Sequence, residues 1–428
     1  MSVQPSASAP GSPRRRHIVQ AARAIGSGHG VSGPSSQLER AFLRLGCTCE
    51  RFTLDTLGLP AAHSQASAAI PDLVRFWRDI VVFSTAGSLA MAWRFRRRRR
   101  RAGTVVICQV DALYGDLFVV RSLHKAFLER HPSRRLMLLR NPLHALVLLR
   151  DHARFRWGIH RHIVALSEAN RQEVIRLYGV PADRITVIPN GVDLDRFRPS
   201  HADRRDVRRA VSIADDEFVV MFAGHEFERK GLRVLLDAQR ALAARGVRVS
   251  MIVAGGDSSD VLKREYRDLE GTLRFLGHRD DIERYYAAAD VFAMPASFDI
   301  SPLVGLEALA SGLPILMTDV GGVGEYLRHG ENGWFITRDP EDVARRLATL
   351  AQDPVTLAQA TRAARASVAD RGWESIAARY LALMERLFPE GSGGAASDGD
   401  DRSGGGASLG SSRELDGPEA IETGRARR

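Results

Sequence analysis

Short runs of apolar, often β-branched residues alternate with longer stretches of mixed polarity along most of the chain. This alternation is typical of βαβ units, in which helices cover a parallel sheet. In the first half, a helix is predicted from about Ser35 to Leu45, and Pro189-Asn190-Gly191 marks a turn. The strands predicted in this half are His17–Ala22, Thr104–Val110, Arg135–Leu139, His162–Leu166 and Ile185–Ile188.

The second half repeats the alternation more regularly. Two helices, Pro354–Val368 and Trp373–Phe388, are predicted to close it. Its predicted strands, each followed by a predicted helix, are Phe218–Ala223, Val249–Ala254, Leu273–Leu276, Val291–Met294, Pro314–Thr318 and Gly333–Ile336.

These patterns predict an α/β protein with two Rossmann-like, doubly wound domains, at residues 16–198 and 199–389, joined near Pro199. Two such domains joined by a hinge are expected to face a cleft, the usual place for ligands in this architecture. Residues 1–15 and 390–428 are predicted to be disordered tails. The second tail is rich in Gly, Ser and Asp and holds too little apolar surface to fold.

The net charge of +10 comes almost entirely from arginine. Only Lys125, Lys230 and Lys263 are lysines among 61 basic residues, which indicates a general preference for arginine in this composition. A basic chain attracts polyanions such as nucleic acid, anionic lipid or phosphorylated substrates. Because the charge follows from composition, it favours a nucleic-acid partner only weakly, and each lysine that does occur becomes a candidate functional residue.

The cysteines and the N-terminus favour a cytoplasmic location. Cys47, Cys49 and Cys108 are an odd number, and their spacing to one another and to histidine does not suit zinc. Residues 1–13 lack the apolar core of a signal peptide. We therefore expect a reducing cytoplasm.

A glycine-rich loop, Gly28-His29-Gly30-Val31-Ser32-Gly33, lies between the first strand and its helix. Its G-x-G-x-x-G pattern, with Asp55 further on, is that of a dinucleotide site. Five residues separate the strand from the first glycine, whereas a dinucleotide turn follows its strand directly. The loop can instead present backbone N–H groups to a phosphate at a helix N-terminus, or form a turn without a ligand.

A second candidate, Gly224-His225-Glu226-Phe227-Glu228-Arg229-Lys230-Gly231, directly follows a predicted strand. The adjacent cations Arg229 and Lys230 suit a diphosphate and can stabilise it as a leaving group. The alternative is a solvated helix start.

A third candidate runs from Asp299 to Glu307 and follows the strand Val291–Met294. Ser301 is expected to cap a helix that starts at Pro302, with an N-terminus suited to an anion. Glu307 lies about two turns into this apolar helix, so its carboxylate needs a partner. Ribose hydroxyls are one option, and an internal salt bridge is the other.

Residues 184–337 closely resemble the retaining glycosyltransferases of family four, which have the GT-B fold. The Phe-Glu-Arg-Lys-Gly form resembles the branch that adds glucose to the lipopolysaccharide core. The resemblance rests on Val187-Ile188-Pro189-Asn190-Gly191-Val192-Asp193, Arg229-Lys230-Gly231, Phe275-Leu276-Gly277, the Glu307 helix with Gly312-Leu313-Pro314, Gly321-Gly322…Glu325 and Gly330…Asn332-Gly333.

The resemblance implies a role for each matching residue. Arg229 and Lys230 would bind the donor diphosphate, Asp299 the sugar hydroxyls and Glu307 the ribose. Further donor contacts would come from Gly28, Gly30, Gly224, Ser301 and Leu303. Candidates on the acceptor side are His29, Arg140 and His144.

The sequence departs from the family at three places. Asp299 replaces the first Glu of the Glu–seven residues–Glu pair, and Ser301-Pro302 replaces the usual Phe-Gly. A family histidine is missing from the first half, where Arg140-Asn141-Pro142 occupies the region. The expected mechanism is retention, in which the leaving phosphate assists attack from the same face. We expect neither metal nor cofactor, since no Asp-x-Asp motif is positioned to hold a cation on a diphosphate.

An uncharged run of 14 residues, Ile80–Trp93, precedes the basic run Arg94–Arg101. A membrane span needs about 20 residues, so this run is too short to cross a bilayer. Aromatic residues beside a basic run suit the surface of an anionic membrane. A helix packed on the first sheet, with a solvated end, is the equally weighted alternative.

The sequence thus predicts an enzyme that moves a hexose from a nucleotide diphosphate sugar to a glycan or lipid-linked acceptor in the synthesis of envelope polysaccharide or lipopolysaccharide. It is expected to be cytoplasmic, with attachment to the inner face of the plasma membrane as an option, and to have no nucleic-acid partner. A nicotinamide-dependent oxidoreductase using Gly28–Gly33 and a basic nucleic-acid-binding protein are the alternatives. Neither alternative assigns a role to Arg229, Lys230 and Glu307.

Overall fold

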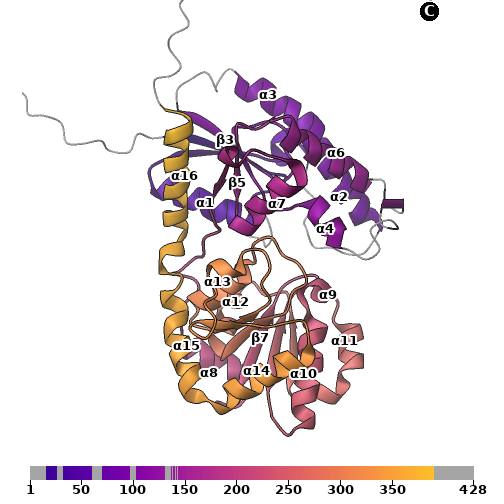
Figure 1. The fold of residues 1–428 in the computed structure, drawn as a ribbon, viewed down its shortest axis with the longest axis vertical. Helices are drawn as coiled ribbons and strands as arrows, with labels where there is room; N and C mark the ends of the chain where they lie inside the picture. Colours follow the sequence, from indigo (N-terminus) through magenta and orange to yellow (C-terminus); the bar gives the residue numbers. More distant parts are fainter. Residues whose placement is uncertain are drawn as a thin grey trace, which may run out of the picture. The chain divides into compact units, whose positions relative to one another are not determined.

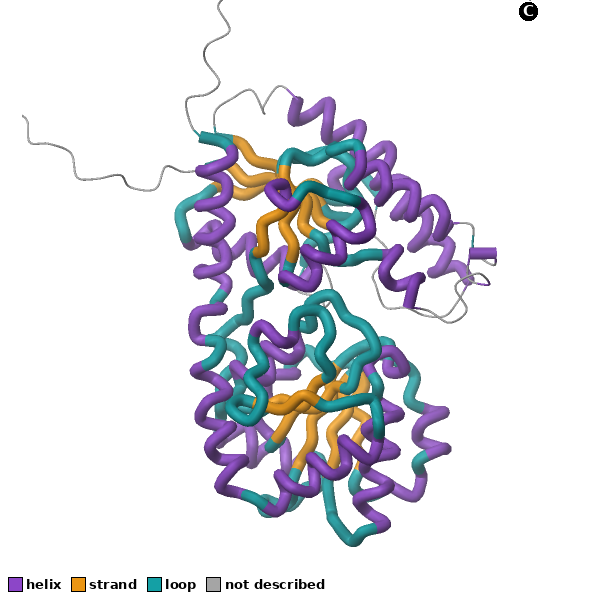
Figure 2. The backbone as a smooth tube through the Cα atoms, viewed as in Figure 1, coloured by secondary structure: helices purple, strands orange, loops and turns teal. Residues whose placement is uncertain are grey.

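A computed structural model of the chain describes residues 16–26, 32–59, 70–96, 103–130, 136, 138–139, 141 and 143–389. Within these residues, the strands form two six-stranded sheets, one from each half of the sequence (Figure 1). Neighbouring strands pair in parallel throughout both sheets. Helices flank the strands, as Figure 2 shows. This is the predicted doubly wound α/β architecture.

The first sheet has the strand order β2-β1-β3-β4-β5-β6. The chain enters the sheet at β1 and moves first to one side and then to the other, which defines a doubly wound sheet. The strands are β1 (His17–Ala21), β2 (Thr48–Phe52), β3 (Thr104–Gln109), β4 (Leu117–Val119), β5 (His162–Ala165) and β6 (Ile185–Val187).

The strand predicted at Arg135–Leu139 is wrong. Its described residues 136, 138 and 139 are helical, and Leu139 is 82% exposed. The strand in this part of the sheet is β4, whose three residues are at most 1% exposed. A central parallel strand is covered on both faces, so a continuous apolar run marks it even when the run is only three residues long.

The first half also contains a long helical stretch that packs on this sheet by one side. It consists of α2 (Ile70–Val82), a π-helical turn (Phe83–Gly87) and α3 (Ser88–Arg96). Phe83 and Phe95 are fully buried against Phe52 of β2. The predicted helix packed on the first sheet is therefore present. The other helices are α1 (Ser32–Arg44), α4 (His124–Arg130), α6 (Leu143–Arg156) and α7 (Glu168–Tyr178).

The second sheet has the order β12-β11-β10-β7-β8-β9, and each of its predicted strands is present within one residue. The turn after β11 is 3₁₀, at Val323–Glu325, where a full helix was expected. The strands are β7 (Val219–Ala223), β8 (Ser250–Ala254), β9 (Leu273–Gly277), β10 (Val291–Met294), β11 (Ile315–Met317) and β12 (Gly333–Phe335). The helices are α8 (His201–Ala210), α9 (Phe227–Lys230), α10 (Leu232–Ala244), α11 (Asp260–Glu265), α12 (Ile282–Ala288), α13 (Leu303–Ala310), α14 (Pro340–Gln352) and α15 (Pro354–Ala366).

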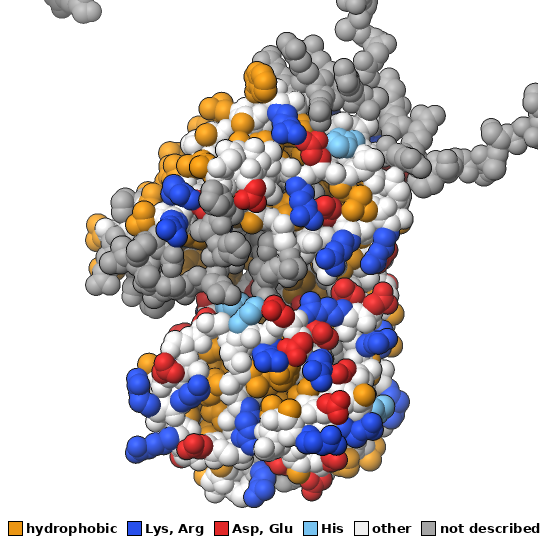
Figure 3. All heavy atoms as spheres, turned by 180° about the vertical axis from the view of Figure 1, so that it is seen from behind, with side chains coloured by type: hydrophobic (Ala, Val, Ile, Leu, Met, Phe, Trp, Pro, Cys, Tyr) orange, Lys and Arg blue, Asp and Glu red, His pale blue; other side chains and the backbone are white. Residues whose placement is uncertain are grey.

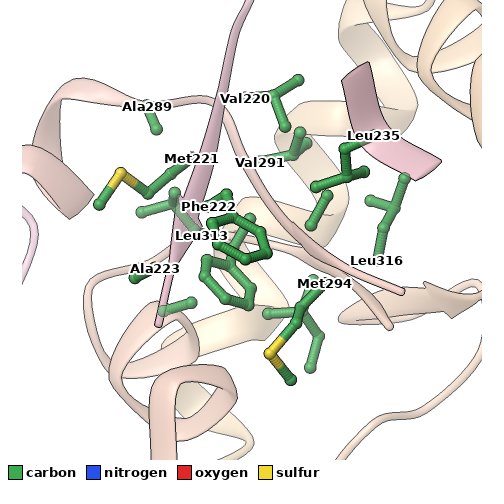
Figure 4. Close-up of a cluster of buried hydrophobic side chains, with 14 of the residues drawn as sticks. Val220, Met221, Phe222, Ala223, Leu235, Ala289, Val291, Met294, Leu313 and Leu316 are labelled. Carbon is green, nitrogen blue, oxygen red and sulfur yellow. The ribbon is translucent and has the colours of Figure 1, made fainter. Parts of the chain in front are cut away.

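The core of the second half surrounds β7 and β10, the two central strands. Figure 4 shows the side chains of Met221 and Phe222 among those of neighbouring strands and helices. Both are fully buried, as are Leu235 of α10 and Leu316 of β11. Because both faces of the sheet are covered, the strands β7, β10 and β11 are apolar at successive positions rather than at alternate ones.

The last helix, α16 (Trp373–Leu387), packs against the first half of the chain. Its buried residues share a cluster with residues of α1, β1 and β3. The rings of Tyr380 and Phe42 of α1 meet edge to face at 6.2 Å. Figure 1 shows α16 alongside α1. The domain limits at residues 198 and 389 stay predictions.

Candidate donor-binding site

A cleft of about 430 Å³ is lined by residues from both halves of the sequence. The first half contributes side chains from α1 and from the loops after β4 and β6, and the second half contributes those after β7 and β10. The carboxyl ends of parallel strands are the usual ligand sites of doubly wound sheets. The cleft is therefore where the architecture predicts a ligand.

Lys230 ends the short helix α9, which follows β7. Gly231 comes next, with φ of +83°, and a Cβ atom there would lie 2.1 Å from the carbonyl oxygen of Pro295. Only glycine combines this left-handed conformation with so close a contact. The glycine holds the end of α9 against the segment after β10, which carries Asp299.

The second and third candidates meet because β7 and β10 are neighbours in the sheet. The Lys230 ammonium donates to Asp299 Oδ2, and the Arg229 guanidinium lies 3.7 Å from the same oxygen. Arg229 also pairs with Glu226 and donates to the carbonyl oxygen of Phe298. Two cations and two carboxylates therefore form one compact cluster at the cleft.

Asp299 is held as a carboxylate despite its burial. Its Oδ1 accepts hydrogen bonds from the backbone N–H groups of Ile300, at 2.7 Å, and Ser301, at 3.1 Å. Burial would raise the pKa of Asp299, but the charge and hydrogen bond of Lys230, with the charge of Arg229, hold that pKa below its usual value. The negative charge facing Lys230 is consequently permanent at neutral pH.

Glu307 lies on α13 and lines the cleft. Its Oε2 accepts a hydrogen bond from the Tyr286 hydroxyl at 3.2 Å, and no basic side chain of the described residues lies within ion-pair distance. Burial raises the pKa of Glu307 to about 7. The internal salt bridge considered as its alternative role is not formed among these residues, and the carboxylate keeps acceptor capacity for a ligand.

Ser301 was expected to cap helix α13, but it does not. Helix α13 begins at Leu303, one residue later than predicted, and Pro302 occupies the cap position without a side-chain hydrogen bond. The Ser301 hydroxyl instead accepts a hydrogen bond from Asn190 Nδ2 at 3.0 Å. Pro302 itself has extended backbone, with φ of −71° and ψ of 107°, so the first helical residue is Leu303. Ser301, Leu303 and Gly224 all line the cleft.

Two predicted donor contacts, Gly28 and Gly30, and two predicted acceptor-side residues, His29 and Arg140, lie outside the described residues. His144 is not among the residues lining the cleft. Its ring stacks on that of His124 at 4.9 Å, and the two rings share a hydrogen bond of 3.0 Å. Burial lowers the pKa of both imidazoles.

Arg121 is a cleft residue that the sequence analysis missed. It follows β4, the strand that was predicted elsewhere, so nothing marked it as the residue at a strand's carboxyl end. Its guanidinium donates to Gln109 Oε1 and, at 3.0 Å, to Asn190 Oδ1. The available signal was the apolar run Leu117–Val120 ending in a single arginine.

No cluster of three or more potential metal ligands occurs among the residues that the structure describes. Independence from metal and cofactors stays a prediction.

Two family models match the chain. Residues 217–353 match the model described as Glycosyl transferases group 1, and residues 31–196 match Glycosyltransferase Family 4. Among curated proteins, an uncharacterized glycosyltransferase of Methanocaldococcus jannaschii is 29% identical over 189 residues, covering 42% of this chain and 48% of that protein. D-inositol 3-phosphate glycosyltransferase 2 of Catenulispora acidiphila is 33% identical over 244 residues, covering 53% and 56%. The aligned part thus spans about half the length of these relatives.

Solved structures with the same fold cover nearly the whole described chain. WaaG, a glycosyltransferase involved in lipopolysaccharide biosynthesis, aligns with a TM-score of 0.68 and 16% identity, over 86% of this chain and 99% of that one. HepE of Anabaena, solved with UDP-glucose, aligns with a TM-score of 0.61 and 19% identity, over 87% and 100%. The chain therefore has the GT-B fold, and residues 31–196 and 217–353 match glycosyltransferase family domains.

Proposed function

We propose that this protein transfers a hexose from a nucleotide diphosphate sugar to a glycan or lipid-linked acceptor, with retention of configuration. The observation that carries the proposal is the cluster of Lys230, Arg229 and Asp299 beside Glu307, at the carboxyl ends of β7 and β10. Matches to two glycosyltransferase models and the UDP-glucose ligand of HepE support it.

The cluster suits a diphosphate that leaves during the reaction. Without substrate, Asp299 compensates the charge of Lys230, so the ammonium stays in place at a low electrostatic cost. An arriving diphosphate offers Lys230 and Arg229 a stronger anion. The Asp299 carboxylate is then free to accept hydrogen bonds from hydroxyl groups of the transferred sugar.

The proposed retaining mechanism assigns no separate base. The departing phosphate accepts the proton of the acceptor hydroxyl as that oxygen attacks from the same face of the sugar. Lys230 and Arg229 stabilise the negative charge that develops on the phosphate. In this scheme no cofactor and no metal takes part.

The names of the relatives bear on the acceptor and the pathway. Some relatives are named for D-inositol 3-phosphate, and WaaG for lipopolysaccharide biosynthesis, so we infer a polar acceptor in cell-envelope synthesis.

No helix among the described residues is long and apolar enough to cross a membrane. Leu89 and Trp93, one turn apart on α3, are 72% and 85% exposed and precede the basic run 94–101. We propose that this face attaches a cytoplasmic enzyme to an anionic membrane.

Mass spectrometry with purified protein and a panel of UDP-, GDP- and ADP-sugars tests the proposal. We expect slow hydrolysis of one donor, releasing its nucleoside diphosphate. The matched control is Lys230→Ala, which should lose this release while remaining folded. Release of no nucleotide from any donor, or equal release by the control, would contradict the proposal.

No observation favours the two alternatives. A nicotinamide enzyme predicts a fluorescence change on titration with NADH, which we do not expect. On the face drawn in Figure 3, basic and acidic side chains are interspersed rather than gathered in a single basic field. A nucleic-acid-binding protein would show steeply salt-dependent binding.

A further inference from the structure

Arg121 stands apart from the other cations of the cleft. Lys230 and Arg229 are paired with Asp299, and Arg196 is paired with Glu283 at 2.7 Å. Among the described residues, no carboxylate lies within ion-pair distance of the Arg121 guanidinium. Its hydrogen-bond partners are two neutral side-chain amides. A guanidinium in a cleft without a counter-ion is unfavourable, and a bound anion would remove that cost.

A chain of buried amides fixes the orientation of this guanidinium. Gln109 accepts from Arg121 and donates to Gln20 Oε1 at 2.9 Å. Gln20 in turn donates to the carbonyl oxygen of Ser35 at 3.0 Å. Gln20 and Gln109 are fully buried, so neither amide can reorient towards water. This arrangement holds the arginine for binding rather than leaving it as a mobile surface charge.

Several donor positions of Arg121 remain for a ligand. Arginine carries five N–H groups, and the two protein acceptors take one from Nε and one from Nη1. No described protein atom accepts from Nη2. Arg121 lines the cleft, so the paired N–H groups that recognise a phosphate or carboxylate are available there.

The position of Arg121 separates it from the proposed donor diphosphate. Arg121 comes from the first sheet, after β4, whereas Lys230 and Arg229 come from the second sheet, after β7. Asn190 joins the two sides, since it accepts from Arg121 and donates to Ser301, two residues after Asp299. An anion on Arg121 would therefore lie next to the transferred sugar, on the side given by the first half.

We propose that Arg121 is a binding residue for an anionic group, a phosphate or carboxylate, carried by the acceptor. Only the assignment of the anion to the acceptor rests on the proposed function. The anion site itself is inferred from charge and geometry. An acceptor with such a group would place its hydroxyl beside the donor sugar, and neutral acceptors would bind less tightly.

Calorimetric titration with inorganic phosphate tests the anion site without any turnover. The titration uses Lys230→Ala protein, in which the diphosphate cluster is weakened, and compares it with the double variant Arg121→Gln/Lys230→Ala. We expect the second substitution to weaken phosphate binding by roughly tenfold to a hundredfold, because charge-assisted hydrogen bonds are lost. Arg121→Lys, which keeps the charge, should retain part of the binding. Equal phosphate affinity with glutamine or arginine at position 121, at equal melting temperatures, overturns the proposal.

Titration with UDP, GDP and ADP separates acceptor from donor. If Arg121 serves the acceptor, Arg121→Gln in the otherwise unchanged chain should alter the affinity for the best nucleotide by less than twofold. A loss of tenfold or more would place Arg121 on the donor diphosphate and overturn the acceptor assignment. Failure of all three nucleotides to bind would refute the proposed function, while the phosphate titration would still decide whether the anion site exists.

Discussion

At the scale of single residues, two carboxyl groups of the cleft, Asp299 and Glu307, differ in their hydrogen-bond partners and in their pKa values. Asp299 is fixed as a carboxylate by Lys230 and two backbone N–H groups. Glu307, eight residues later, has a tyrosine hydroxyl as its one side-chain partner among the described residues, and burial raises its pKa to about 7. The two carboxylates should therefore respond differently to pH and to substitution.

Lys230→Ala should lower kcat by about a hundredfold or more without unfolding the protein. The departing diphosphate gains charge in the transition state, so a fixed cation acts more strongly there than on the bound donor. Lys230→Arg should recover only part of the rate, because a planar guanidinium is not a compact charge. Steady-state kinetics and melting temperatures measure both. A near-normal kcat for Lys230→Ala would show that the diphosphate binds elsewhere.

Glu307→Gln should mainly raise the donor KM, because contacts with the ribose are similar before and during reaction. Donor affinity of the parent protein should fall as the pH drops below about 7, since protonation of Glu307 removes an acceptor for ribose hydroxyls. In Glu307→Gln this part of the pH dependence should disappear. The donor Kd of the parent protein and of Glu307→Gln, measured from pH 5.5 to 8.5, tests both expectations. If the two proteins show the same dependence of Kd on pH, Glu307 is excluded from the ribose site.

The same pKa has a consequence for folding. The folded-state pKa of Glu307 is raised above its unfolded value, so the folded state binds more protons between the two values. Stability from this group therefore decreases as the pH rises from about 4.5 to 7 and is constant above that. Denaturant unfolding gives the free energy of unfolding of the parent protein and of Glu307→Gln. The difference between these two free energies should become smaller as the pH falls. A constant difference would mean that Glu307 titrates normally.

At the scale of elements, the apolar pattern of the sequence was most informative in the second half. The strands of the second sheet were predicted within one residue because most of them are apolar at successive positions and end in a clear turn. It failed at β4, because the equally apolar run at Arg135–Leu139 was assigned as the strand in its place. That error hid Arg121. The role of Ser301 also escaped prediction, because its partner Asn190 is 111 residues away.

The basic run 94–101, which begins on α3, can be tested for membrane binding. Replacing Arg96–Arg101 with glutamine should weaken co-sedimentation with anionic vesicles, since each basic residue near such a surface contributes about 1 kcal/mol. Trp93→Ser should weaken it further through loss of an exposed apolar side chain. Replacing the exposed Arg209 and Arg345 of the second half is the matched control. Unchanged sedimentation, or none by the parent protein, would contradict membrane attachment.

At the scale of the whole molecule, the cleft combines residues that sequence alone assigns to separate halves. The family resemblance placed Arg229, Lys230, Asp299 and Glu307, all from the second half. Arg121 of the first half was missed, because it follows a three-residue strand and its partner Asn190 is 69 residues away in the sequence.

Activity should survive removal of divalent metal. The proposed site neutralises the diphosphate with Lys230 and Arg229, so donor hydrolysis or transfer should proceed at a similar rate in EDTA. Assays with EDTA, and with Mg²⁺ or Mn²⁺ added back in excess, provide the comparison. Complete loss in EDTA with recovery on adding metal would refute the metal-independent mechanism.

The packing of α16 has a consequence for synthesis on the ribosome. The first sheet receives its last strand at Val187, but Trp373, Tyr380 and Met384, which complete its apolar cluster, come much later. Translation proceeds at about 5–20 residues per second, so the nascent first half waits roughly 10–40 s with part of its apolar surface uncovered. A chaperone that binds nascent chains would find its target there, and chains stopped before residue 373 should be more prone to aggregation than the full-length protein.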